Sequence, residues 1–324
     1  HEVFRYRSSS WAQRLAQVHA IANNCPPTTR CHCTIWKAKQ GSLRETAHQA
    51  TWNLESNLMK LALAGSKILI TGGASGIGRQ MALQAAARGA HVCIWDLNDG
   101  KAVVDEIATL GGSAESHQID VTNIETVREL AIRQGSVDVL INNAGVVSGQ
   151  WFLDTDPSAI ERTYRVNVLS LYWMTQTFLP AMIQNRKGAV VTIASAAGLI
   201  GVAKQTDYSA SKFAAVGFME SLRAELRTKG AQVNTLTVCP FYIDTGMFDG
   251  VQTRFPLLLP IMKPEYVAKK VLDSIERGKP VLVLPWFART MPLMRLLPIR
   301  AFDAVADFFG VNKTMDHFKG RISK

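Results

Sequence analysis

The sequence predicts an α/β fold, a single doubly wound domain in which helices cover both faces of a seven-stranded parallel sheet. From Lys60 onward, seven short apolar runs rich in β-branched residues alternate with segments of helical periodicity. Strands that are covered on both faces have this composition. A glycine-rich stretch, Thr71–Gly78, directly follows the first run, which is where such folds bind phosphate.

The elements follow one another in strict alternation. The expected strands are Lys67–Thr71, His91–Trp95, Ala114–Ile119, Val137–Asn142, Ala189–Ala194, Gln232–Val238 and Pro280–Leu284. The expected helices are Ile77–Arg88, Gly100–Leu110, Ile124–Gln134, Ser158–Asn185, Tyr208–Thr228 and Pro264–Arg277. A helix between each pair of strands implies that the strands run parallel.

Length and charge limit the class of protein. The chain has 324 residues, of which 47% are hydrophobic, and this suffices for one large core. No apolar run reaches the ~18 residues that a membrane-spanning helix needs, and no signal peptide is evident. The net charge of +10 is concentrated at the ends, since residues 1–58 and 281–324 each carry seven Lys or Arg and three Asp or Glu. No nucleic-acid-binding motif is recognised, so we expect no nucleic-acid partner.

Cysteine usage indicates a reducing compartment. The chain has five cysteines, an odd number: Cys25, Cys31, Cys33, Cys93 and Cys239. Cys93 falls in an expected strand and Cys239 directly follows one. This argues against a disulfide framework, so we expect a cytoplasmic protein. The sequence Cys31-His32-Cys33 lacks the paired spacing of zinc sites, and no metal is expected.

The stretch Thr71–Gly78 reads T-G-G-A-S-G-I-G, and its glycines fit G-x-x-x-G-x-G rather than the common G-x-G-x-x-G spacing. Gly72 permits a tight turn, Gly76 lets the backbone approach a pyrophosphate, and Gly78 lets the helix pack closely on the sheet. Free N–H groups at the start of the helix then face the phosphates. An ordinary glycine-rich turn has the same letters, so the loop alone is a weak signal.

An acidic residue at the end of the second strand strengthens the nucleotide interpretation. Asp96 stands about twenty residues past the glycine loop, where the dinucleotide rule places a carboxylate that accepts the ribose hydroxyls. Such a carboxylate repels the 2′-phosphate of NADP, and no Arg or Lys stands immediately beside Asp96. The sequence therefore favours NAD over NADP as the cofactor. A solvated Asp at a strand end is the alternative.

A tyrosine and a lysine four positions apart, Tyr208 and Lys212, open a predicted helix. Residues at this spacing lie on one helix face. An ammonium near the phenol stabilises the phenolate and lowers the tyrosine pKa from about 10. Such a tyrosine takes a proton from an alcohol or gives one to a carbonyl. By itself, however, Y-x-x-x-K is common on helices and carries little information.

Four motifs occur in a fixed order: T-G-x-x-x-G-x-G at Thr71–Gly78, N-N-A-G at Asn142–Gly145, Ser195 at a strand end, and Y-x-x-x-K at Tyr208. Together they resemble the short-chain dehydrogenase/reductase family over about residues 65–285. The resemblance implies a Rossmann-like domain and an NAD(P)-dependent alcohol dehydrogenase or carbonyl reductase acting on CH–OH donors. It also implies a homodimer or homotetramer. A non-catalytic nucleotide-sensing or scaffold protein on the same fold is the alternative.

The same resemblance implies catalytic roles at the matching positions. Tyr208 would be the general acid and base, and Lys212 would hold the nicotinamide ribose and tune the tyrosine. Ser195, thirteen residues before Tyr208, would hydrogen-bond the substrate oxygen. Asn167 would complete a water-linked proton relay. Each position has a plain structural explanation of its own, but a pure binder has no need of all four.

Cofactor contacts carry over in the same way. Asp120 would contact adenine, Asn143 would stabilise the sheet beside the cofactor, and Ile243 and Thr245 would contact the nicotinamide carboxamide. The complete expected set is Gly72, Ser75, Gly76, Ile77, Gly78, Asp96, Asp120, Val121, Asn143, Ala144, Gly145, Tyr208, Lys212, Ile243 and Thr245. One departure concerns the P-G that the family usually has after the sixth strand, since Phe241 follows Pro240 here.

On the substrate side the chain is similar to one branch of the family, the membrane-associated retinol dehydrogenases and 17-beta-hydroxysteroid dehydrogenases. The similarity lies in Cys239–Phe248 and in Gly310–Asp316. It implies a lipophilic alcohol as substrate: retinol, a hydroxysteroid or a long-chain alcohol. The apolar segment Phe255–Met262 is expected to be a lid that excludes water. A plain connection between helices is the alternative.

The chain is expected to have three parts. Residues 1–58 are a disordered or loosely attached leader, residues 59–285 the dinucleotide-binding catalytic domain, and residues 286–324 a C-terminal extension that mixes apolar and basic side chains. Such a mixture suits a segment that lies on a membrane or a dimer contact, and both stay open. Peripheral contact with the cytosolic face of a membrane is therefore one of two expectations for the extension.

Overall fold

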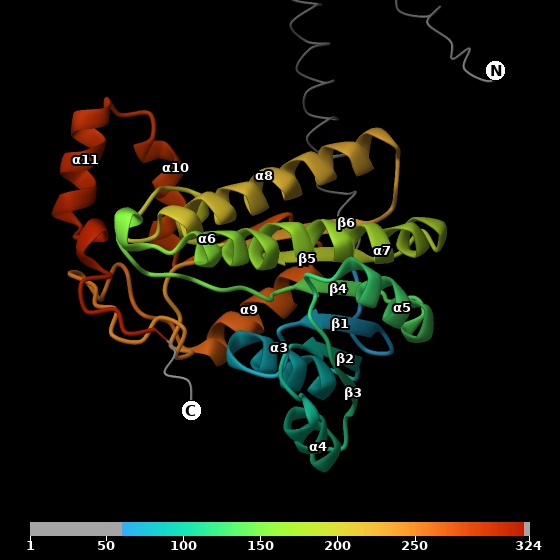
Figure 1. The fold of residues 1–324 in the computed structure, drawn as a ribbon. Helices are drawn as coiled ribbons and strands as arrows, with labels where there is room; N and C mark the ends of the chain where they lie inside the picture. The colour runs from blue at the N-terminus through green and yellow to red at the C-terminus, as the bar shows by residue number, and fades with distance from the viewer. Residues whose placement is uncertain (1–59, 321–324) are drawn as a thin grey trace, which may run out of the picture. The chain divides into compact units, whose positions relative to one another are not determined.

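The computed structural model describes residues 60–320. The predicted leader and Cys25, Cys31 and Cys33 lie outside this range. One parallel sheet of seven strands organises the fold, in the order β3-β2-β1-β4-β5-β6-β7 (Figure 1). Its strands are β1 (Lys67–Thr71), β2 (His91–Asp96), β3 (Ser113–Gln118), β4 (Val139–Asn142), β5 (Ala189–Ile193), β6 (Asn234–Pro240) and β7 (Val281–Leu284). The predicted doubly wound fold is confirmed.

Helices cover both faces of the sheet (Figure 1). They are α3 (Gly76–Ala87), α4 (Lys101–Thr109), α5 (Ile124–Gln134), α6 (Pro157–Tyr164), α7 (Ser170–Gln184), α8 (Thr206–Thr228) and α9 (Pro264–Glu276). Successive side chains of a strand point to opposite faces. In β1, Ile68 and Ile70 accordingly join the apolar cluster of α3, α4 and α9, while Leu69 joins that of α5, α7 and α8.

The order of the strands places a crevice between β1 and β4. From β1 the chain builds one half of the sheet outward to β3, and from β4 it builds the other half outward to β7. Ligands of doubly wound sheets bind outside the carboxyl ends of the strands where the order reverses. The glycine loop follows β1 and Asn143–Gly145 follow β4, so the fold brings both motifs to this point.

The predicted helix Ser158–Asn185 is observed as a continuous helical stretch that contains a π-helical turn. A π-helical turn, Arg165–Leu169, separates α6 from α7. Its central residue Asn167 donates from Nδ2 to the carbonyl of Val146 at 2.9 Å, and its Oδ1 accepts from the Val146 amide at 2.8 Å. Single π-helical turns often mark functional sites. Here the turn accompanies a side chain that is tied to the loop after β4.

The C-terminal extension packs onto the same core. After β7 the chain forms a 3₁₀ turn (Trp286–Thr290), α10 (Met291–Met294), α11 (Ile299–Phe308) and a second 3₁₀ turn (Val311–Lys313). Ala306, Val311 and Met315 are buried in the apolar cluster that contains α3 and α9. The extension is therefore anchored by apolar contacts, although it also leaves several large apolar side chains exposed.

A polar cluster lies on β1, β2 and β3 away from the crevice. Glu115 accepts hydrogen bonds from Gln134 at 2.7 Å and from the Cys93 thiol at 3.2 Å, and Lys67 Nζ lies 3.7 Å from it. Burial alone would raise the pKa of Glu115, but the hydrogen bonds from Gln134, Cys93 and His91 and the charge of Lys67 lower it to about 2. His91, Cys93 and Glu115 have metal-ligand chemistry, but the Lys67 ammonium disfavours a cation among them.

We expect Glu115→Gln to lower the free energy of unfolding by about 1 kcal/mol at neutral pH. Hydrogen bonds to a charged group contribute somewhat more than this, and screening at a side chain that is 40% exposed reduces the value. Because folding lowers the pKa from 4.5 to about 2, the contribution is complete above about pH 4.5 and is lost as the pH falls toward 2. Urea denaturation from pH 7 to pH 3 measures it.

The control for this prediction is Glu129→Gln, the same change on the exposed face of α5. It should leave the free energy of unfolding within about 0.5 kcal/mol of the wild-type value. A Glu115→Gln deficit that stayed constant down to pH 3 would contradict the assigned charge effect.

Candidate active site

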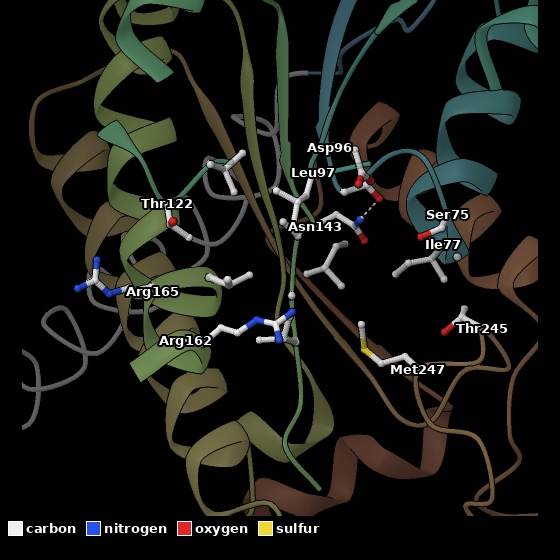
Figure 2. Close-up of a pocket in the computed structure, with 18 of the residues that line it drawn as sticks. Ser75, Ile77, Asp96, Leu97, Thr122, Asn143, Arg162, Arg165, Thr245 and Met247 are labelled. Carbon is white, nitrogen blue, oxygen red and sulfur yellow. Dashed lines mark hydrogen bonds between the residues drawn. The ribbon is translucent and has the colours of Figure 1, made fainter. Parts of the chain in front are cut away.

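A cavity of about 550 Å³ lies at the carboxyl ends of β1, β2 and β4 (Figure 2). Arg162 and Arg165, which no sequence motif marks, line it across from Asp96. Its lining includes every predicted cofactor residue except Gly78: Gly72, Ser75, Gly76, Ile77, Asp96, Asp120, Val121, Asn143, Ala144, Gly145, Tyr208, Lys212, Ile243 and Thr245.

The glycine loop is shaped by close backbone approach. Gly72 and Gly76 have φ angles of +66° and +57°, a region that side chains with a Cβ rarely adopt. A Cβ on Gly78 would overlap the carbonyl oxygen of Gly72. Asn143 Nδ2 donates to the carbonyls of Thr71 and Gly72, at 2.9 Å each. Because α3 begins at Gly76, its first amides, which have no partner within the helix, border the cavity.

Asp96 is a buried carboxylate at the end of β2, with 7% of its surface exposed. Its Oδ2 accepts from the Ala74 amide at 3.0 Å, and its Oδ1 accepts from the backbone and side-chain nitrogens of Asn98 at 2.9 and 3.2 Å. These donors fix the carboxylate beside the glycine loop. A carboxylate has about four acceptor sites, so Oδ2 keeps one that can accept a further hydrogen bond.

Tyr208 lines the cavity and is hydrogen-bonded with Ser195. Tyr208 lies in the first turn of α8 and is 5% exposed. Burial raises the pKa of Tyr208 above its usual value, and a hydrogen bond with the Ser195 side chain opposes this effect. We expected the Lys212 ammonium to lower this pKa, but desolvation outweighs favourable interactions here. The Ser195 hydroxyl also accepts from the Ala197 amide at 3.1 Å, which orients it.

Lys212 lies one turn along α8 from Tyr208. Its Nζ donates to the carbonyl of Ile193 at 2.8 Å and stands 5.6 Å from the centre of the Tyr208 ring. Burial lowers the pKa of Lys212 to about 8. A Cβ built on Gly145 would lie 3.6 Å from this Nζ and 3.4 Å from Asn167 Oδ1. Of the four predicted catalytic residues, Tyr208 and Lys212 line the cavity. Ser195 and Asn167 do not line it, but Ser195 is hydrogen-bonded with Tyr208 and Asn167 lies near Lys212 at Gly145.

One buried carboxylate near the site follows from no motif. Asp207 directly precedes Tyr208 and is 7% exposed. It accepts hydrogen bonds from the hydroxyls of Ser148 at 2.6 Å and Thr163 at 2.7 Å. It therefore ties the start of α8 to the loop after β4 and to α6. Sequence spacing gave no sign of this contact, because its three members are far apart along the chain.

A small apolar pocket adjoins the cavity behind Tyr208 and has a volume of about 20 Å³. Tyr208 belongs to the lining of both. The pocket is lined by Ser195, Ala196, Ala197, Ile200, Val202, Gln205, Tyr208, Phe241, Tyr242, Phe248, Met291 and Val311. Phe241, the departure from the family pattern, packs edge-on against Tyr242 with ring centres 4.6 Å apart, so the aromatic residue serves as pocket wall.

The predicted lid is misplaced. No residue of Phe255–Met262 lines the apolar pocket of the described chain. Leu259 and Met262 are buried in the main core instead, and Leu257 is 98% exposed. The covering side chains come from Phe248 and from the C-terminal residues Met291 and Val311. The error arose because an apolar run by itself does not say which surface it covers.

Comparisons with known proteins agree with this geometry. The family model for short chain dehydrogenases matches residues 66–254. The chain is 42% identical to epidermal retinol dehydrogenase 2 of Mus musculus, over 81% of this chain and 88% of that protein. It is 36% identical to short-chain dehydrogenase/reductase 3 of Homo sapiens, over 80% of this chain and 88% of that protein. It is also 36% identical to retinol dehydrogenase 10-B of Danio rerio, over 79% of this chain and 85% of that protein.

Solved structures show the same fold. A short-chain dehydrogenase/reductase from Burkholderia phymatum in complex with NAD superposes with a TM-score of 0.66 at 26% identity, covering 73% of this chain and 95% of that one. A metagenomic short-chain oxidoreductase in complex with NADP superposes with a TM-score of 0.58 at 28% identity, covering 69% of this chain and 97% of that one. This chain therefore belongs to the short-chain dehydrogenase/reductase family, in its retinol dehydrogenase branch, and is an oxidoreductase acting on alcohols.

Proposed function

We propose that this enzyme uses NAD to interconvert a lipophilic alcohol and its carbonyl, with Tyr208 as the general acid and base. Retinol, a hydroxysteroid and a long-chain alcohol are the candidate substrates. The observation that carries the proposal is the place of Tyr208, whose buried side chain lines both the large cavity and the apolar pocket. The similarity to two retinol dehydrogenases supports the lipophilic class.

The lining of the large cavity fits a dinucleotide. Gly72, Gly76 and the first residues of α3 line the cavity, which suits a pyrophosphate at this helix N-terminus. Asp96 Oδ2 has acceptor capacity for a ribose hydroxyl. Asp120 and Val121 would hold adenine, and Ile243 and Thr245 the carboxamide. When bound, NAD supplies the nicotinamide ring that accepts or gives the hydride.

The residues around Tyr208 handle the proton. In the oxidation direction the Tyr208 phenolate takes the hydroxyl proton of the alcohol, and in reduction the phenol returns it to the carbonyl oxygen. The Ser195 hydroxyl hydrogen-bonds the same substrate oxygen and so positions it. Lys212, held by the Ile193 carbonyl, orients the ribose. Asn167 stands beside Lys212, a placement that supports a water-linked relay to solvent.

A substrate panel tests the proposed function. Retinol, a hydroxysteroid, a long-chain alcohol and ethanol are each offered with NAD and with NADP, and reduced cofactor is followed by absorbance. We expect turnover of at least one lipophilic alcohol with NAD at a kcat/KM far above that for ethanol. Tight NAD binding without turnover of any alcohol or carbonyl would favour the alternative, a nucleotide-sensing or scaffold protein.

We expect Asp207→Asn to lower kcat about tenfold to a hundredfold, because an amide nitrogen replaces one of the two acceptors that bind Ser148 and Thr163. Misplacement of the first turn of α8 moves Tyr208, and small errors in position are costly in catalysis. The KM for NAD should change little. Steady-state kinetics with the alcohol and NAD both varied measures kcat and the KM for NAD separately.

Asp303→Asn on α11 is the matched control for Asp207, since it makes the same change at an exposed position. It should retain wild-type kcat. If Asp207→Asn lost thermal stability but kept its kcat, Asp207 would be a purely structural residue.

We further propose that the C-terminal extension contacts a membrane surface. Across residues 60–320, helices of the length and apolar character that a bilayer crossing requires are absent. The extension nevertheless exposes Leu296 to 82% and Ile299 to 79%, close in sequence to Arg289, Arg295 and Arg300. Apolar side chains flanked by basic ones suit peripheral binding to an anionic bilayer, which would be the cytosolic face.

Replacing both Leu296 and Ile299 by Glu should abolish co-sedimentation with vesicles of phosphatidylcholine containing anionic phosphatidylserine. The charges are costly to bury in the interface and repel the lipid headgroups. Ile132→Glu on α5, a side chain that is 84% exposed, is the control and should bind like the wild type. Equal binding of both variants would exclude this surface as the lipid contact.

The exposed apolar residues of α7 support a homodimer or homotetramer. Leu169, Tyr172 and Ile183 are 41%, 39% and 39% exposed along this helix and its preceding turn. Apolar side chains that share a helical surface favour burial against a partner. Sedimentation equilibrium of the wild type and of Tyr172→Glu tests the association; a variant that stays associated would exclude this face.

A further inference from the structure

The end of the described chain crosses the loops that surround the active site. The segment Val311–Lys319, here called the strap, follows α11 and returns beside the orange loops after β6 (Figure 1). The amide of Lys319 donates to the carbonyl of Asp249 at 2.8 Å, and Lys204 Nζ pairs with Asp316 at 3.0 Å. The strap is therefore bonded both to the loop after β6 and to the loop before α8.

The strap packs closely against two glycines, Gly149 and Gly250. Gly250 has a φ of +85°, and a Cβ there would overlap the carbonyl oxygen of His317. Gly149 has a φ of +69°, and a Cβ there would overlap the ring of Phe318. The loop after β4 thus contacts the strap as well. Three active-site loops fit against this segment, which indicates a defined closed position.

A chain of buried hydrogen bonds, each with a defined donor, connects Gln205 with the strap. Gln205 Nε2 can only donate, and it donates to the Tyr242 hydroxyl at 3.0 Å. The Thr314 hydroxyl donates to the carbonyl of Val311 at 2.8 Å, so its oxygen accepts from the Tyr242 hydroxyl, 2.8 Å away. Tyr242 therefore links the strap with Gln205, the residue that directly precedes α8 and stands three positions before Tyr208. All of these side chains are buried.

The closed strap leaves no room for a lipophilic substrate. The apolar pocket beside Tyr208 has a volume of about 20 Å³, whereas pockets for ligands of this size are about 300 Å³ or larger. Val311, the first residue of the strap, forms part of its wall, and Phe248 packs between Tyr208 and Tyr242 with ring-centre distances of 5.7 and 5.1 Å. A bulky substrate can reach Tyr208 from this side only when the strap moves away.

We propose that Tyr242 is a specificity-determining residue: its hydrogen bond to Thr314 holds the strap over the apolar pocket, and breaking that bond admits bulky alcohols to Tyr208. The inference rests on the proposed function for its substrate. The contact that closes the strap is the single hydrogen bond between the hydroxyls of Tyr242 and Thr314. The apparent affinity for a bulky alcohol is then reduced by the small fraction of molecules with an open strap.

Tyr242→Phe and Thr314→Val should each raise the open fraction. Loss of one buried hydrogen bond changes such an equilibrium by about threefold to tenfold, so the KM for retinol should fall by this factor. The KM for cyclohexanol, which needs less space, should fall less, and the KM for NAD should stay constant. The double variant should show less than the product of the two single effects, because both changes remove the shared Tyr242–Thr314 bond. Thr314→Ser keeps the hydroxyl and should behave like the wild type.

Hydrogen exchange gives a readout that needs no turnover. Amides of residues 311–320 should exchange faster in Tyr242→Phe and Thr314→Val, and at the wild-type rate in Thr109→Val, which removes a threonine hydroxyl from the exposed helix α4. Retinol should also bind more tightly to Tyr242→Phe and Thr314→Val than to the wild type, and the fluorescence of retinol measures this binding. Unchanged exchange, or a Thr314→Ser variant that behaves like Thr314→Val, would overturn the proposal. If the wild type oxidised no alcohol, the proposed function would fail, while exchange and retinol binding would still decide whether this bond closes the strap.

Discussion

Tyr208→Phe is expected to reduce kcat for alcohol oxidation by at least about a thousandfold. General acid–base catalysis contributes about 10²- to 10⁴-fold. The other phenol of the apolar pocket, Tyr242, is held by hydrogen bonds with Gln205 and Thr314, so it is poorly placed to replace Tyr208. The ring itself remains, so its edge-on packing with Phe248 and the fold should persist. Affinity for NAD, measured by titration calorimetry, should change less than threefold. Tyr172→Phe, on the exposed face of α7, should keep wild-type turnover.

The pH dependence of the wild type follows from the same group. Because burial raises the pKa of Tyr208, the phenolate needed for oxidation becomes more abundant as the pH rises, and the oxidation rate should rise with it. Reduction needs the neutral phenol and should slow at high pH. Oxidation rates that fell with rising alkalinity in a stable protein, or a Tyr208→Phe variant with substantial turnover, would remove Tyr208 from its proposed role.

The sequence predicted the sheet because its signals are local. Short apolar strands such as Lys67–Thr71 are bounded by turn residues, and this strand is observed with the predicted bounds. The π-helical turn at Asn167 was not predictable in this way. Its residues have ordinary helical character, and the π-helical turn depends on a contact with Val146, which lies in a different part of the chain.

Long-range contacts also explain what was missed around the site. Asp207 belongs to no sequence motif, and its importance depends on the hydroxyls of Ser148 and Thr163. Likewise, the strap covers the apolar pocket although Phe255–Met262 is the more apolar segment. Motif spacing identifies groups that share a helix or a loop, whereas partners brought together by tertiary packing have no fixed spacing.

Replacing Asp96 by Ser and Leu97 by Arg should reverse the proposed preference for NAD. The carboxylate lies beside the glycine loop with two donors on Oδ1 and one on Oδ2, and in the proposed placement of the cofactor it repels a 2′-phosphate. Leu97 lines the same cavity and is 61% exposed (Figure 2), so an arginine there can reach the phosphate. Removing a repulsion and adding an ion pair amounts to about 4 kcal/mol, and the ratio of kcat/KM for NADP to that for NAD should rise about a thousandfold.

Asp99→Ser separates a local carboxylate effect from a change of net charge. Asp99 lies three positions further along, is exposed, and does not line the cavity, so its loss should leave the cofactor ratio within about twofold of the wild type. The effect of the double replacement should also weaken at high salt, because an exposed guanidinium is screened while the removal of a buried carboxylate is not. A wild-type enzyme that used NADP as well as NAD would contradict the assignment of Asp96, since the same oxygens cannot both accept the ribose hydroxyls and tolerate a phosphate in their place.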